Sequence, residues 1–121
     1  QITNTGIAMT GNFTGDFVAT GNITAYSDER LKHEWQDLDE DVLSKALDVK
    51  YGTYERKDLD PNVRHIGVSA QDLAKVMPEA ARLNDDGYYS VNYGAASMAL
   101  LLEMNKKIAA LEAEIKTLKG E

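Results

Sequence analysis

The C-terminal quarter of the sequence carries a heptad pattern, which constrains the fold more than any other feature. From about residue 93 to Gly120 no proline interrupts the chain, so one long helix is predicted. Apolar residues fill the a and d positions of three successive heptads: Leu101, Met104, Ile108, Leu111, Ile115 and Leu118. An a/d seam is stable when equivalent helices cover it, so the pattern predicts a coiled coil between identical chains.

The residues beside this seam indicate how the helices are arranged. Opposite charges fall at g and at the following e of a parallel partner: Lys107 with Glu112, and Glu114 with Lys119. Isoleucine at a with leucine at d favours two strands, so the heptads predict an oligomer without specifying a trimer. Gly94 and Ser97 occupy the preceding a and d positions, which predicts that the first part of the helix packs on its own domain. The alternative is a single amphipathic helix that folds back on that domain.

The N-terminal stretch 7–25 alternates with a period of two. Odd positions hold Ile, Met, Phe, Ala and Gly, whereas even positions are mostly Thr and Asn. This pattern is typical of extended chain with one buried face, and Gly-Asn-Phe-Thr at 11–14 recurs ten residues later as Gly-Asn-Ile-Thr. The apolar face is too thin for one copy to fold alone, which favours the end of a fibrous β-structure shared among identical chains. A hairpin or edge strands docked on the following domain are the alternative.

Between these two regions the sequence predicts a small α+β domain. The acidic cluster at 37–41 suits the N-terminus of a short helix that begins at Val42. Ser69, with Asp72 three residues later, has the form of a capping box that opens a helix through Met77. The other predicted segments are strands at 49–56 and 65–68 around a turn at 58–62, a short helix at 79–83, a turn at 85–87 and a strand at 88–91.

Composition excludes several classes of function. The 121 residues carry a net charge of −7 and have a pI near 4.8, which argues against nucleic-acid binding. No cysteine is available for a disulfide, a thiolate nucleophile or a cysteine-based zinc site, and no apolar run approaches the ~20 residues of a membrane span. The acidic cluster does not fit a calcium loop, so neither a metal nor a cofactor is predicted. The first residue is Gln1 instead of methionine, which favours a piece of a longer protein.

The hexapeptide Ser27–Lys32 lies where the β-patterned tract meets the charged domain. Cleavage by a serine needs a base for the hydroxyl proton, and a lysine serves only where burial or a nearby cation lowers its pKa. Residues five apart do not share a helix face, so a loop or bend would have to bring Ser27 and Lys32 together. Arg30 is the nearby cation or oxyanion ligand, His33 is an alternative base, and Asp28 could orient a donor. The spacing alone is more typical of a solvated helix N-cap.

The hexapeptide Ser-Asp-Glu-Arg-Leu-Lys, placed after a Gly/Thr/Asn-rich tract, resembles the start of a known domain. This is the C-terminal intramolecular chaperone domain of phage tailspikes, tail fibres, neck appendages and endosialidases, the self-cleaving S74 peptidase family. Further matching segments are RHIGVSAQD at 64–72, VMPEA at 76–80, DGYYSVNY at 86–93 and the leucine-rich helix. The sequence departs from the family at 33–35, where His-Glu-Trp replaces a segment resembling Glu-Asn-Ile.

The resemblance implies a homotrimer in which residues 1–26 end a triple β-helix and 27–121 form the chaperone domain, with the coiled-coil helix at 93–119. It implies a single-turnover serine autopeptidase with catalytic Ser27 and Lys32, supported by Asp28, Arg30 and His33. The implied partners are two identical chains, with no nucleic acid and no membrane, and a host receptor only through the mature fibre. The implied location is a phage tail or neck fibre precursor assembled in the host cytoplasm, from which the chaperone domain is released after cleavage.

The bond that breaks is left open between Tyr26–Ser27 and Ser27–Asp28. Attack of the Ser27 hydroxyl on the Tyr26 carbonyl passes through a five-membered ring, whereas attack on its own carbonyl would need a strained four-membered ring. Cleavage after Ser27 would therefore need water or a neighbouring chain's serine as the nucleophile. The alternative functions are a structural trimeric cap that does not cleave, and a receptor-binding fibre tip that uses Trp35, Tyr51 and Tyr54.

Overall fold

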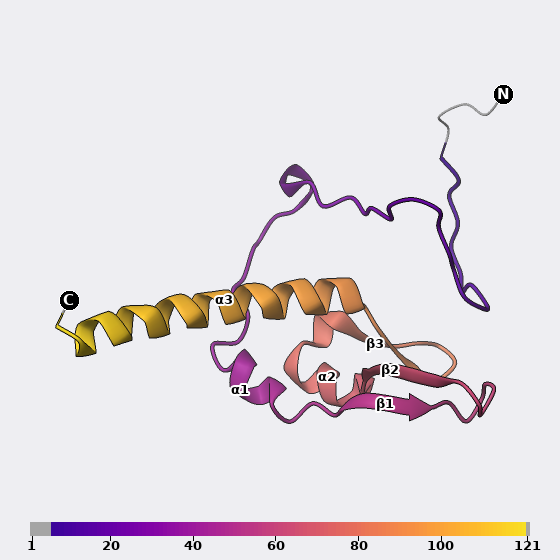
Figure 1. The fold of residues 1–121 in the computed structure, drawn as a ribbon. Helices are drawn as coiled ribbons and strands as arrows, with labels where there is room; N and C mark the ends of the chain where they lie inside the picture. Colours follow the sequence, from indigo (N-terminus) through magenta and orange to yellow (C-terminus); the bar gives the residue numbers. More distant parts are fainter. Residues whose placement is uncertain (1–5, 121) are drawn as a thin grey trace. The chain divides into compact units, whose positions relative to one another are not determined.

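The computed structural model of the protein describes residues 6–120, which fall into two compact units (Figure 1). The first unit extends to Trp35, and the second begins at Gln36. The predicted domain boundary at 26/27 rests on composition and remains a prediction. Each unit is described by itself below.

The described part of the first unit is an extended chain. Its regular element is the short 3₁₀ helix η1, Glu29–Leu31. No strand forms between residues 6 and 26, and the apolar side chains of the alternating pattern are exposed, with Ile7 at 91% and Ile23 at 74%. A single chain offers these residues no neighbouring strand and no opposing apolar face. The predicted strands are therefore absent from the single chain, and the shared β-structure remains a prediction about an assembly.

The second unit contains the predicted hairpin. Strands β1, Tyr51–Glu55, and β2, Arg64–Val68, pair antiparallel, with Tyr51 opposite Val68 and Glu55 opposite Arg64. In the connecting turn the side chain of Asp60 accepts a hydrogen bond from the backbone N–H of Asn62 at 2.9 Å. Local turn chemistry therefore predicted this hairpin correctly.

Two short helices accompany the hairpin, as the sequence predicted. Helix α1, Val42–Ala46, follows an acidic segment in which the Asp39 carboxylate pairs with Lys45 and accepts the backbone N–H of Asp41 at 2.8 Å. The hydrogen bond to Lys45 is the main cause that lowers the pKa of Asp39 below its ordinary value of 3.8. Within the acidic cluster it is therefore Asp39 that stabilises the start of α1, through its bonds to Asp41 and Lys45.

Helix α2, Ala70–Val76, begins with half of the predicted capping box. Ser69 Oγ accepts the backbone N–H of Asp72 at 3.1 Å, as expected. Asp72 does not bond back to Ser69, because the Ser69 N–H donates to the Lys50 carbonyl at 2.8 Å. The Asp72 carboxylate instead accepts the Lys50 N–H at 3.0 Å. The cap therefore also ties α2 to the residue that precedes β1.

The segment 79–83 differs from the prediction. A 3₁₀ helix, η2, covers Pro78–Ala80, but Ala81–Leu83 forms strand β3 and pairs antiparallel with β4, Tyr89–Val91. The turn between them contains Gly87 at φ +87°, a conformation that glycine adopts without steric cost. The helical prediction for Ala81–Leu83 was wrong because a strand this short is specified by its partner across the turn and not by its own pattern.

The long helix predicted at 93–119 is present as α3, Tyr93–Leu118. The Asn92 side chain caps it by accepting the Ala95 N–H at 3.1 Å. Ala96 is buried, and Ala99 and Leu100 pack against the core, so the first part of α3 does contact its own domain. Figure 1 shows that the second half of α3 extends beyond the other elements of this unit.

The core of the second unit is small. The buried residues share one cluster and come from the three α-helices, the segment 77–80 and strand β3: Val42, Leu73, Met77, Ala80, Ala81 and Ala96. The β1–β2 hairpin contributes Val68, which is partly buried against this cluster. A core of this size leaves much apolar surface exposed, which is typical of domains that associate with partners. In the part of the chain that the structure describes, no helix has both the length and the apolar character needed to cross a membrane.

Candidate functional site

The structure brings Ser27 and Lys32 together around η1. The backbone turns once, with the Leu31 N–H bonded to the Asp28 carbonyl at 3.1 Å and the Lys32 N–H bonded to the Glu29 carbonyl at 3.0 Å. Ser27 precedes this turn and Lys32 follows it, and Lys32 Nζ donates a hydrogen bond to Ser27 Oγ at 2.5 Å. The required bend between the two side chains is therefore this single 3₁₀ turn.

Asp28 and Arg30 form a second pair within the same turn. The Asp28 carboxylate accepts the Arg30 backbone N–H at 2.9 Å, and it receives the guanidinium through Nε at 3.1 Å and Nη2 at 2.8 Å. The side-chain hydrogen bond to Arg30, followed by the backbone one, lowers the pKa of Asp28, and the same pairing raises the pKa of Arg30. Asp28 therefore acts as the cap of η1 and holds Arg30, so the nearest cation to Lys32 in sequence already has an anionic partner.

His33 is placed after the turn and contributes no hydrogen bond among those that the described residues make. Ser27, Lys32 and His33 are all exposed. Water stabilises the charged form of an exposed amine, so proximity alone does not make a base of the lysine. The structure therefore places the Ser27 hydroxyl beside the Lys32 amine. In the single chain, however, this amine is not shielded from water, as the reaction requires.

Trp35 is a neighbour of this site that the sequence argument did not assign to it. Lys32 Nζ lies 5.6 Å from the centroid of the Trp35 ring, within the range of a cation–π contact. The signal available in the sequence was the single tryptophan of the chain, three residues after the lysine.

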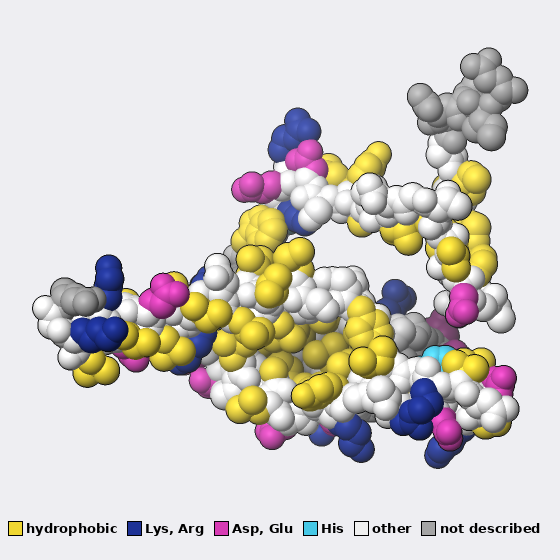
Figure 2. Space-filling model, viewed as in Figure 1, with side chains coloured by type: hydrophobic (Ala, Val, Ile, Leu, Met, Phe, Trp, Pro, Cys, Tyr) yellow, Lys and Arg dark blue, Asp and Glu magenta, His cyan; other side chains and the backbone are white. Residues whose placement is uncertain are grey.

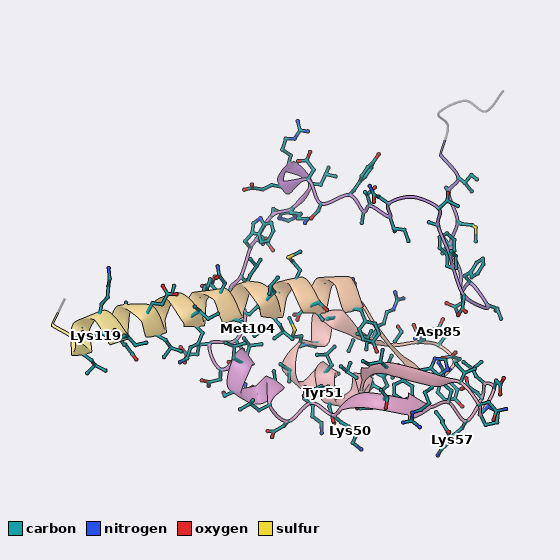
Figure 3. The ribbon with its side chains drawn as sticks, in the orientation of Figure 1. Lys50, Tyr51, Lys57, Asp85, Met104 and Lys119 are labelled. Atoms are coloured by element: carbon teal, nitrogen blue, oxygen red, sulfur yellow. The ribbon has the colours of Figure 1, made fainter. Side chains whose placement is uncertain are left out.

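The heptad residues lie on α3 of the second unit with no partner on them. Leu101, Met104, Ile108, Leu111, Ile115 and Leu118 form what we call the heptad stripe, and their exposed fractions run from 44% to 87%. Figure 3 labels Met104, a member of the stripe, and Lys119, which directly follows its last member. The domain packs against Ala96 and Leu100 in the first turns of α3, and the stripe begins after them, at Leu101. The stripe is therefore exposed because it lies beyond the part of α3 that contacts the domain.

An apolar cleft of about 200 Å³ opens within the second unit. It lies between the start of β1, β2, α2 and the first turns of α3, and its walls include Tyr51, Leu73, Tyr93 and Leu100. Hydrophobic side chains gather around this region in Figure 2. None of the predicted catalytic residues lines it, and residues 6–120 gather no His, Cys, Asp or Glu cluster that could hold a metal ion.

Comparison with known proteins identifies the segment that starts at the serine. The sequence profile described as "chaperone of endosialidase", Peptidase S74, matches residues 27–82. The long tail fiber proteins Gp37 of Enterobacteria phage M1 and of Enterobacteria phage Ox2 are each 32% identical to the chain over 118 residues. These matches cover 89% of the chain and 46% of each relative, so the chain spans about half the length of these proteins. Residues 27–82 therefore match the Peptidase S74 family, the chaperone of endosialidase.

Proposed function

We propose that this chain is the self-cleaving intramolecular chaperone of a phage fibre protein. In this proposal three copies associate, template the winding of their N-terminal tracts into a triple β-helix, and then cut themselves beside Ser27. The observation that carries it is the hydrogen bond from Lys32 Nζ to Ser27 Oγ at the first residue of the family match. Because the relatives are long tail fibre proteins, the proposed location is a phage virion.

Two exposed apolar surfaces support an assembly of identical chains. The heptad stripe is uncovered on α3, and the alternating apolar residues are uncovered in the first unit. Each surface repeats along the chain in a form that a second copy can match, through heptads in one case and a two-residue period in the other. Association through α3 would hold the N-terminal tracts of the copies close together, which lowers the entropic cost of winding them around one another.

The same assembly would complete the site chemically. Packing of neighbouring chains around η1 would remove water from Lys32, which disfavours a charged amine and prepares it to accept a proton. Cleavage would then follow trimer folding and not precede it. The loss of the templating domain would make the fold of the mature fibre kinetically persistent, since the element that nucleated it is no longer attached.

Cleavage of the Tyr26–Ser27 bond would take two steps, an acyl shift from nitrogen to oxygen and then hydrolysis of the ester. The Ser27 hydroxyl oxygen attacks the Tyr26 carbonyl carbon while its proton passes to the Lys32 amine. The tetrahedral intermediate collapses by breaking the bond to the Ser27 nitrogen, which takes the proton back from Lys32 and becomes a free amine. Water then hydrolyses the ester between Tyr26 and Ser27 Oγ, giving the Tyr26 carboxylate and the regenerated hydroxyl.

For the Ser27–Asp28 bond the nucleophile differs. Water, or the serine of a neighbouring chain, would attack the Ser27 carbonyl, and the proton would pass through Lys32 to the Asp28 nitrogen as that bond breaks. A neighbour's serine would leave an ester that water hydrolyses in a second step. The two routes give different fragments, ending at Tyr26 or at Ser27.

Intact mass spectrometry of the freshly folded full chain tests the proposal and locates the bond. We expect the wild-type chain to give two fragments, and Ser27→Ala and Lys32→Ala to give one uncut chain. Ser90→Ala and Lys57→Ala change exposed residues of the same types outside the site, and both should cleave like the wild type. A folded, oligomeric wild-type chain that stays whole would overturn self-cleavage.

A trimeric cap that does not cleave is the second candidate. The exposure of Ser27 and Lys32 favours it, because the single chain gives the amine no buried environment. It predicts oligomers with an uncut chain, which the same mass measurement distinguishes. A receptor-binding tip has weaker support, since Tyr51 and Tyr54 stand three residues apart on β1 and therefore face opposite sides of the hairpin.

A further inference from the structure

We propose that Trp35 is a positioning residue for Lys32 in the self-cleavage reaction. Its indole ring would hold the lysine amine against Ser27 Oγ, so that the proton acceptor is in place when the site closes. This inference rests on the proposed function, because positioning has meaning only if Lys32 acts on Ser27. It assigns a role to a residue at which the sequence departs from the family pattern.

The first argument is the placement of the amine between two partners. Lys32 Nζ is 2.5 Å from Ser27 Oγ and 5.6 Å from the centroid of the Trp35 ring. A lysine side chain is long and flexible, and at an exposed site one contact leaves its amine free to sample many positions. A ring on one side and a hydroxyl on the other restrict the amine to the place where proton transfer to it is possible.

The second argument is the backbone between the two residues. In extended chain, residues three apart point to opposite sides, and Lys32 itself is extended, with φ −122° and ψ 144°. Glu34 interrupts the extension with φ +56°, and in the described residues it is the one non-glycine with a positive φ. Few such residues adopt this conformation, so the bend is a specific feature of the segment. It provides the reversal that an extended segment needs for the Trp35 ring to reach Lys32.

The third argument is the chemical nature of the partner. Among the nearby acids, Asp28 is occupied by the backbone and guanidinium groups of Arg30. The ion pairs of the described residues include none between Lys32 and Glu29 or Glu34. The amine is therefore oriented by an aromatic face and not by a carboxylate. The ring attracts the charged amine before the site closes, and it offers no acceptor that would compete for the serine proton once the amine has become neutral, whereas a carboxylate would. An aromatic residue at position 35 suits a lysine that must be held and must still accept a proton.

Replacement of the ring by other side chains gives the kinetic test. The full chain is refolded as wild type, Trp35→Phe and Trp35→Leu, and the rate at which fragments appear is followed by intact mass spectrometry. We expect Trp35→Leu to cleave about two- to fivefold more slowly, the effect of losing an exposed cation–π contact, and Trp35→Phe to recover most of the rate. Tyr88→Leu removes an equally exposed aromatic residue from the second unit and should leave the rate unchanged.

Trp35 fluorescence provides a readout that does not depend on cleavage. The chain has one tryptophan, so its emission reports on this position alone. In the uncut Ser27→Ala chain we expect Lys32→Met to change the emission intensity, and Lys57→Met to leave it unchanged. Wild-type cleavage rates in Trp35→Leu, or Lys32→Met emission identical to that of the parent, would overturn the positioning role alone. A wild-type chain that never cleaves would overturn the proposed function, and the positioning role with it.

Discussion

The backbone N–H of Val68 donates a hydrogen bond to the phenolic oxygen of Tyr93 at 3.2 Å. Val68 ends β2 and Tyr93 begins α3, so this bond joins the hairpin to the first turn of the long helix. The ring reaches the strand across Gly67, where a Cβ would collide with Tyr93 Oη and lie 3.0 Å from Tyr54 Oη. The absence of a side chain at Gly67 therefore permits the contact that orients α3 on its domain.

Gly67→Ala should destabilise the second unit by about 1–3 kcal/mol, because a side chain inserted at a filled position forces its neighbours to move. The measurement is urea unfolding of the Ser27→Ala chain, which remains whole. Gly94→Ala is the matched control, since no atom lies closer than 3.8 Å to a Cβ there and alanine is favoured in a helix. That variant should be neutral or more stable. Equal stability of Gly67→Ala and its parent would contradict the role given to Tyr93.

Association through the heptad stripe can be tested by placing a charge on it. Leu111→Glu should convert the assembly to monomers of 13.3 kDa, because a carboxylate at a d position would be buried without a partner. Ala113→Glu, two residues away at the outward f position, should leave the assembly intact. Light scattering of the Ser27→Ala chain during size-exclusion chromatography gives both masses. A parent with twice the chain mass would support a dimer and contradict the trimer.

The ion pair between Asp39 and Lys45 should make stability depend on pH at the acidic end. The hydrogen bond to Lys45 lowers the pKa of Asp39, so folding favours its charged form. That contribution is fully present above the ordinary value of 3.8 and is lost as the pH falls through the lower folded value. Asp39→Asn should therefore weaken the fold slightly near neutral pH, and the difference should disappear well below 3.8.

Urea unfolding of both chains across this range provides the measurement. The neutral-pH effect should be small because both side chains are exposed. Asp37→Asn removes a nearby acid for which no ion pair is recorded among the described residues, and it should show no such pH-dependent difference. An Asp39→Asn effect that grows as the pH falls would contradict the sign derived from the lowered pKa.

Local chemistry accounts for the parts of the fold that the sequence predicted. The turn at 58–62, the serine cap at Ser69 and the unbroken run from Tyr93 each act within a few residues, so their patterns are visible without a structure. The strand Ala81–Leu83 was missed because its identity depends on pairing with Tyr89–Val91. The alternating tract 7–25 also depends on partners, and in one chain it has none.

In the candidate site, too, the sequence predicted the residue types, whereas their arrangement depended on the backbone conformation. The residue types at Ser27 and Lys32 indicated the chemistry, but their spacing matches no regular helix face, and their proximity comes from the single turn of η1. Asp28 and Arg30 were predicted to lie near the site, but the hydrogen bonds between them were not predicted. The contact between Trp35 and Lys32 could not be inferred from the spacing, because it comes with a positive φ at Glu34, a conformation that glutamate rarely adopts.

The positive φ at Glu34 can be tested with two substitutions that distinguish the effect of its backbone conformation from that of its carboxylate. Glu34→Gly should cleave at the wild-type rate or faster, because glycine adopts φ +56° without steric cost. Glu34→Val should cleave more slowly, because a β-branched residue strongly disfavours positive φ and would turn Trp35 away from Lys32. Fragment formation, followed by intact mass spectrometry, measures both rates, and Trp35 emission in the Ser27→Ala background shows whether the contact is lost. If the two variants slow cleavage equally, the Glu34 carboxylate and not the bend is what matters, and the conformational argument for Trp35 fails.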